Sequence, residues 1–371
     1  MALDLAHVSS TSPDPVRAVA ELAEQIGHRT AEALVFFCTH DYDLDILGRE
    51  LGQVFPGTTI GCTSSGHFGP HGFQLTGIVG VAFFGGALRI TPFLIAPLAR
   101  HTEQVARIAE EVRALCDADP ALNRFGLLLV DGLSMAEESL VGTLYQLVGN
   151  LPIIGGSAGD NLRFERTHVY AGDGTFLSDA ALFALIETRQ PVAAFKTQHF
   201  APSDNELVIT EADTGQRLIR EMNGEPAALA YARAIGLPVE ALTPSVFAHY
   251  PLVLTLGDGT YVRSIQKVNA DLSMPCYCAI EEGLIVSIGQ ALDPVQTLSD
   301  ALAAVRDSVP EPALILGCDC ILRRLQFERQ DISAAMSDLM AKSDVFGFFT
   351  YGEQFNGVHV NQTLTAVAIG G

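Results

Sequence analysis

Positive charge is scarce in this chain of 371 residues. Lys and Arg together number 22 against 43 Asp and Glu, which gives a formal charge of −21 at pH 7. Such a surface repels nucleic acid and anionic lipid, so binding to either is not expected, and a basic protein partner suits the charge better. No run approaches the roughly 20 apolar residues of a membrane-spanning helix, so no membrane span is expected.

A secretion signal is also missing from the sequence. The N-terminus, "MALDLAHVSSTSPDPVRAV", has no basic segment followed by an apolar stretch, so no signal peptide is expected. The seven Cys are an odd number, and without a secretion signal we expect reduced thiols and a cytoplasmic protein. Hydrophobic residues make up 48% and charged residues 18%, which indicates a core-rich folded protein.

Catalytic motifs are a third absence. The glycine-rich stretches "GCTSSG" and "GGSAGD" contain serine, but neither matches the G-x-S-x-G of a nucleophile elbow. Neither contains the lysine that a phosphate-binding P-loop needs. No C-x-x-C-H occurs, which excludes covalent c-type haem attachment. We therefore do not expect an enzyme.

What the sequence does contain is one pattern written three times. Each copy has an apolar strand, a helix with apolar residues at helical spacing, a second strand that enters a glycine turn, and a return strand. The helices are expected at 43–55, 136–150 and 331–340. The strands are expected at 33–40 and 77–84 in the first copy, at 126–134 and 179–187 in the second, and at 312–320, 344–353 and 364–370 in the third.

The glycine turns of the three copies end alike, with a polar residue after the last glycine. They are Gly66-His67, Gly159-Asp160 and Gly352-Glu353. Strand–helix–strand units favour parallel pairing with a right-handed crossover, and the return strands make the sheets mixed. The sequence therefore predicts an α/β fold of mixed sheets built from three repeated units, with ligand sites where the strands end.

The segment between the second and third copies has a different pattern. Alternating strands joined by Gly and Asp turns predict antiparallel pairing there, and Asp293 is the expected N-cap of a helix over 293–309. A further short helix is expected over 225–238. We place a domain boundary near Asn223-Gly224, which gives an N-terminal extension and helix at 1–30 and domains at 31–222 and 223–371.

Five stretches carry a resemblance to a known family: "TTIGCTSSG", "PIIGGSAGD", "FERTHVY", "NGEPAALAYARAIG" and "DVFGFFTYGE". Together, and in this order, they resemble FIST-domain proteins, with an N-terminal FIST region at 31–222 and a C-terminal one at 223–371. The resemblance implies a sensory module that binds a small ligand and passes the signal to a separate protein. The chain also resembles the nitric-oxide-sensing haemoproteins known as NosP, which bind haem b and regulate a hybrid histidine kinase or a cyclic-di-GMP enzyme.

The haem interpretation centres on "GDNLRFERTHVY", residues 159–170. His168 is the expected axial ligand of the iron, with Arg163 and Arg166 pairing with the propionates. If this stretch is a strand, Phe164, Arg166 and His168 share one face. Asp160 joins the expected haem site, and the alternative iron ligands are His199 and His67.

Two other interpretations stay open at this point. His168 could be an ordinary half-buried histidine with a hydrogen-bond partner. The protein could also be a haem-free module for an amino-acid-like molecule, held by Arg163 and the turn residues Gly66, Gly159, Gly352 and Glu353. A homodimer is left open by the sequence. The pairs Cys276/Cys278 and Cys318/Cys320 lack the spacing of structural zinc sites, so we expect buried thiols and no zinc there.

Overall fold

The computed structural model describes residues 2–257 and 259–371, and the chain divides into two compact units. The first contains Met1–Lys196, Ser299–Val358 and Leu364–Gly371, and the second contains Thr197–Leu298 and His359–Thr363. This division differs from the boundary expected near Asn223-Gly224, because the third repeat folds back into the first unit. Within the described ranges, no helix has both the length and the apolar character that a membrane crossing requires.

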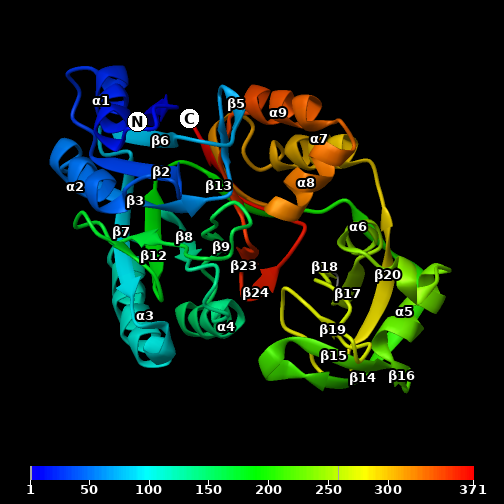
Figure 1. The fold of residues 1–371 in the computed structure, drawn as a ribbon. Coiled ribbons are helices and arrows are strands. Elements are labelled where there is room, and N and C mark those ends of the chain that lie inside the picture. The colour runs from blue at the N-terminus through cyan, green and yellow to red at the C-terminus, as the bar shows by residue number, and fades with distance from the viewer. Residues whose placement is uncertain (1, 258) are drawn as a thin grey trace. The chain divides into compact units, whose positions relative to one another are not determined.

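The first repeat forms a mixed sheet in the first unit, as the sequence predicts (Figure 1). Its two central strands pair in parallel, and the return strand pairs antiparallel with the first of them. The Asp43 side chain caps the helix by accepting a hydrogen bond from the Ile46 N–H. The elements are β1 (Asp4–Ser10), α1 (Pro15–Ile26), β2 (Ala33–Thr39), α2 (Leu44–Val54), β3 (Thr58–Ser64) and β6 (Ile78–Phe84).

The second and third repeats have the same plan. In each, a parallel strand pair is joined through helix, and an antiparallel return strand flanks the first strand. The second comprises β7 (Leu88–Ile95), α3 (His101–Ala118), β8 (Asn123–Val130), α4 (Glu137–Val148), β9 (Ile153–Ser157) and β12 (Ala181–Thr188). The third comprises β13 (Val192–Thr197), β21 (Pro312–Cys320), α8 (Ile321–Arg329), α9 (Ser333–Lys342), β22 (Val345–Thr350) and β25 (Leu364–Gly370).

Short hairpin strands after the glycine turns link the three sheets to one another. The hairpin strands β4 (His67–Gly69) and β5 (Gly72–Gln74) join the sheet of the third repeat through β22. Strands β10 (Val169–Tyr170) and β11 (Phe176–Leu177) join the first sheet through β3. Strand β23 (Glu353–Phe355), followed by β24 (Val358–Val360), joins the second sheet through β9. Each repeat therefore gives its hairpin to a neighbour, and the exchange closes a cycle.

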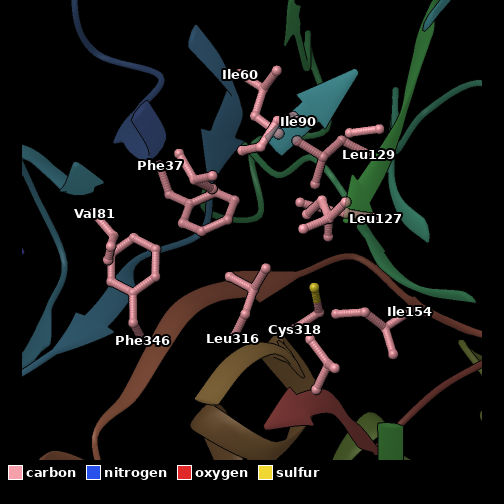
Figure 2. Packing of buried hydrophobic residues seen from close by; sticks show 14 of the residues in the cluster. Phe37, Ile60, Val81, Ile90, Leu127, Leu129, Ile154, Leu316, Cys318 and Phe346 are labelled. Atoms are coloured by element: carbon pink, nitrogen blue, oxygen red, sulfur yellow. The ribbon is translucent and has the colours of Figure 1, made fainter. Parts of the chain in front are cut away.

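The three sheets of the first unit share one hydrophobic core (Figure 2). Strand residues alternate between this core and the helix-covered outer faces. On β2, Phe37 faces the shared core and Phe36 packs against the helices of the first repeat. The Phe37 ring stacks on Phe348 of the third repeat with 4.2 Å between centroids. Leu127 contributes from the second repeat.

The second unit is built on the antiparallel sheet that the sequence predicts between the second and third repeats. Its strands have the order β16-β15-β14-β20-β17-β18, with β19 beside β15. Asp293 caps the helix that leaves this unit by accepting from the Val295 and Gln296 N–H groups, as expected. The elements are β14 (Phe200–Asp213), β15 (Leu218–Met222), β16 (Glu225–Pro226), α5 (Ala227–Ile235), α6 (Pro244–His249), β17 (Leu252–Leu256), β18 (Gly259–Arg263), β19 (Met274–Pro275), β20 (Ile285–Ala291) and α7 (Pro294–Val305).

Candidate functional site

A cleft of about 550 Å³ opens in the first unit beside His168. One wall is the end of β2 and the start of α2, and the other is the segment that follows the second glycine turn. The volume lies within the range of small-molecule sites in proteins. The lining residues are His40, Tyr42, Asp43, Leu44, Asp45, Asp160, Arg163, Glu165, Arg166, His168 and Phe176.

Residues 160–168 form a loop, so the strand expected through Arg166 and His168 is wrong. Asn161, Leu162 and Phe164 have positive φ angles of 56°, 65° and 54°, which no β-strand allows. Regular strand pairing begins only at β10, next to His168. Non-glycine residues with such backbone angles persist where surrounding structure holds them, and they are concentrated at functional sites.

The Asp160 carboxylate holds this loop in place. It accepts hydrogen bonds from the Phe164, Glu165 and Arg166 N–H groups at 3.0, 2.7 and 3.1 Å, and from the Tyr351 hydroxyl. Burial alone would raise the pKa of Asp160, but these donors outweigh it and the net pKa is lowered. Asp160 is therefore a loop cap in its charged form.

Tyr351, from the third repeat, reinforces the loop in two further ways. Its hydroxyl oxygen accepts a hydrogen bond from the Leu162 N–H at 2.6 Å. Its ring stacks on Phe164, with 5.1 Å between centroids. Arg324, also from the third repeat, donates to the Asn161 side-chain oxygen at 3.1 Å. One wall of the cleft is thus built by the second repeat and fixed by the third.

Two imidazoles line the cleft with ring nitrogens that lack a partner in the described structure. They are Nδ1 of His168 and both ring nitrogens of His40, whose Nε2 is 3.3 Å from Asp41 without hydrogen-bond geometry. Burial lowers the pKa of both residues, with Arg166 adding to the effect at His168. Both rings are therefore neutral near pH 7, the form in which imidazole accepts hydrogen bonds or binds a metal.

The charged residues of the cleft fall into two groups. Arg163 pairs with Asp41 at 2.7 Å, whereas the Arg166 guanidinium has no hydrogen bond or ion pair with any residue in the described ranges. Asp43 and Asp45 stand on the opposite wall, where Asp43 also caps α2. The cleft therefore offers a free cation on one side and carboxylates on the other.

The sequence did not reveal the wall formed by residues 40–45, and His40 is the residue of that wall with the most evident ligand chemistry. It follows directly after β2, so it lies at the carboxyl end of a parallel strand, where such sheets place their ligand sites. Phe164, by contrast, does not line the cleft. Its ring stacks on the Tyr351 ring and is half exposed. The cleft around His168 is not an apolar slot, because most of the lining residues are charged or polar.

The remaining predicted site residues lie elsewhere. His199 is in the second unit, fully buried against the Phe200 ring. His67 is fully buried on β4, with its Nδ1 3.3 Å from the Ser64 hydroxyl. Neither histidine is part of the cleft lining.

The three glycine turns lie inside the protein. The Gly159 N–H donates to the Thr63 carbonyl and the Gly352 N–H to the Thr350 hydroxyl, so neither amide is directed at the cleft. A Cβ on Gly159 would lie 2.2 Å from the Ser65 hydroxyl, which explains the glycine there. Gly66 and Glu353 are also buried, and Glu353 accepts a hydrogen bond from Thr350.

The four cysteines of the two C-x-C motifs are buried thiols outside any disulfide. Burial raises the pKa of Cys276 and Cys318 far above the usual value, which disfavours the thiolate that zinc would need. The two pairs belong to different units. Among the described residues, no group of three or more His, Cys, Asp or Glu has a metal-binding arrangement.

Distant structural likenesses span the whole chain. Cyanuric acid hydrolase from A. caulinodans is 10% identical with a TM-score of 0.39, over 100% of this chain and 99% of that one. T. maritima PurL complexed with FGAR is 12% identical with a TM-score of 0.21, over 99% of this chain and 72% of that one. At these values the likenesses carry no argument. No curated protein matches the chain.

Family models give a clear result. The FIST N domain matches residues 32–225, and the FIST C domain matches residues 227–356. FIST domains are signal-transduction sensor domains that bind small ligands. The two matches cover most of the sequence, including every residue that lines the cleft. The chain therefore belongs to the FIST family and contains both its N and C domains.

Proposed function

We propose that this protein is a sensor whose signal ligand is a small polar molecule bound in the cleft beside His168. The observation that carries the proposal is the free Arg166 guanidinium opposite Asp43 and Asp45. A guanidinium is matched by a carboxylate, and carboxylates are matched by an ammonium group. A zwitterion of amino-acid size meets both requirements, and the neutral imidazoles add hydrogen-bond acceptors.

Signal transmission follows from the construction of the cleft wall. A ligand shifts a protein between two conformations only by binding one of them more tightly. The loop at 160–168 is the element that a ligand would contact and that the third repeat holds through Tyr351 and Arg324. We infer that ligand binding changes the position of this loop. A separate histidine kinase or cyclic-di-GMP enzyme is the proposed receiver, on the family resemblance.

Haem b with nitric oxide as its ligand is the second candidate, favoured by the partnerless ring nitrogens of His168 and His40. These imidazoles suit iron, and Arg163 and Arg166 suit propionates. The walls suit a porphyrin less well, because Leu44, Tyr42 and Phe176 supply the only apolar surface among the described lining residues. Haem, when bound, would supply the iron that holds the gas, and His168 would orient it.

Thermal unfolding with each of the twenty amino acids tests the first candidate. At least one should raise the melting temperature of the wild type, and Arg166→Gln should abolish that rise. Arg220→Gln, at a half-exposed arginine of the second unit that pairs with Glu211, is the control. Absence of any shift in the wild type would contradict the proposal.

Absorption spectroscopy after haem supplementation tests the second candidate. A Soret band that disappears or moves in His168→Ala and in His40→Ala would support haem ligation in the cleft. A wild-type spectrum without a Soret band would rule it out. A band unchanged in both variants would indicate that another residue of the protein binds the iron.

A further inference from the structure

The cleft beside His168 carries more negative than positive charge. Four carboxylates and two guanidiniums line it, so its charged side chains have a formal charge of −2. A ligand that is neutral overall would leave this excess uncompensated, and charge complementarity is a main source of binding specificity. The carboxylates belong to Asp43, Asp45, Asp160 and Glu165, and the guanidiniums belong to Arg163 and Arg166.

Two of these six groups are already matched within the protein. Arg163 pairs with Asp41 at 2.7 Å, and this ion pair joins the two walls of the cleft. The Asp160 carboxylate accepts three backbone N–H groups of its own loop and the Tyr351 hydroxyl. Both groups are therefore occupied before a ligand binds.

Three carboxylates and one guanidinium remain for a ligand. In the part of the chain that the structure describes, Asp45 and Glu165 have no ion pair, and neither carboxylate accepts a hydrogen bond. Asp43 accepts only from the Ile46 N–H of its own helix. Both these acids and Arg166 are exposed to solvent, so a dissolved molecule can reach their charged groups.

An amino acid with a cationic side chain fits this set better than one with an uncharged side chain. Its carboxylate matches the Arg166 guanidinium, and its two cationic groups match two carboxylates where a neutral amino acid matches only one. Leu44 and Phe176 offer apolar surface to the methylene groups of a long side chain. The cleft volume of about 550 Å³ leaves room for such a chain.

We propose that the ligand of this cleft is a basic amino acid, of which lysine is the simplest example. Arg166 binds its α-carboxylate, and Asp43, Asp45 and Glu165 bind its two ammonium groups. This inference rests on the proposed function, because it names the chemical class of the ligand at the same site. Neutral amino acids bind more weakly, since they make one charge-assisted contact fewer.

Isothermal titration of the full chain at pH 7 with lysine, norleucine and cadaverine tests the class of ligand. Norleucine lacks the side-chain ammonium of lysine, and cadaverine lacks the carboxylate. Lysine should bind about tenfold or more tightly than either. Norleucine binding as tight as that of lysine would overturn the basic class and leave the proposed function intact. If lysine does not bind, this inference fails, and the thermal screen of the twenty amino acids decides separately whether the proposed function fails with it.

A double variant assigns the carboxylates. Asp45→Asn combined with Glu165→Gln leaves Asp43 as the one unmatched carboxylate, so the preference for lysine over norleucine should be lost. The control is Glu111→Gln combined with Asp117→Asn, which removes the same charge from exposed positions on α3 and should keep the preference. A cleft double variant that prefers lysine as strongly as the wild type does would refute the assignment.

Discussion

Individual histidines of this protein differ in what their surroundings allow. His168 and His40 line the cleft with free ring nitrogens, whereas His67 is enclosed in the third sheet. Desolvation lowers the pKa of all three, because a charged imidazole loses its hydration on burial. For the cleft histidines the result is a neutral ligand group. For His67 it is a dependence of stability on pH.

The effect is largest at His67, where burial lowers the pKa from 6.5 to about 4. Between these values the unfolded chain binds a proton at this residue and the folded protein does not, so stability falls as the pH is lowered through the window. We expect His67 to remove about 2 kcal/mol of unfolding free energy between pH 7 and pH 5.

Urea denaturation of the wild type and of His67→Gln at these two pH values measures this contribution. The pH dependence should be smaller in the variant, and His28→Gln, at an exposed histidine, should behave like the wild type. Identical pH dependence in wild type and His67→Gln would contradict the assigned cause.

At the scale of elements, the loop at 160–168 forms one wall of the cleft without regular secondary structure. The backbone N–H groups of residues 164–166 have no strand partner and converge on Asp160 instead. The Asp160 carboxylate therefore accepts the backbone hydrogen bonds that a neighbouring strand would accept in a β-sheet. This carboxylate holds the backbone at Arg166, whereas the His168 N–H donates to the Thr63 hydroxyl at 3.1 Å.

Asp160→Asn should release this loop. The asparagine would present an NH₂ group where the carboxylate accepts from Glu165 and Arg166, so buried donors would lose their acceptor. The expected cost is about 1–3 kcal/mol of unfolding free energy. Hydrogen–deuterium exchange should also become faster at residues 164–166.

The matched control is Asp173→Asn, since Asp173 accepts a local backbone hydrogen bond in an exposed turn. It should leave both stability and exchange at 164–166 unchanged. Exchange at 164–166 as slow in Asp160→Asn as in the wild type would show that Asp160 does not hold the loop.

The sequence predicted the regular elements well because their patterns are local. The apolar runs of β2 and β25 and the Asp293 cap depend on neighbouring residues only. The loop at 160–168 was mistaken for a strand because its conformation depends on Tyr351, which lies 191 residues from Asp160. His40 was overlooked because its role follows from the loop that faces it.

At the scale of the whole chain, the three repeats of the first unit depend on one another. The short hairpin of each repeat pairs with the sheet of another repeat, so a single repeat by itself would lack the strand with which its hairpin pairs. Their inner faces fill one core. The sequence showed the three copies but not the exchange, because pairing between hairpin and sheet is a tertiary choice.

Phe37→Ala tests this interdependence. The ring is fully buried and contacts the third repeat through Phe348, so its loss should cost about 3–5 kcal/mol. Amides in β8 and β21 should lose exchange protection together with those of β2. Phe164→Ala, at a half-exposed ring, is the control and should leave protection in these strands intact. Loss of protection confined to β2 would contradict a shared core.

The central claim is that a small zwitterion binds between Arg166 and the carboxylates of the α2 wall. Isothermal titration with the amino acid that gives the largest thermal shift tests it most directly, in the wild type and in Arg166→Gln. We predict saturable binding by the wild type and about tenfold or greater weakening in the variant. Equal affinity of the two proteins for that amino acid would contradict the assignment of the site.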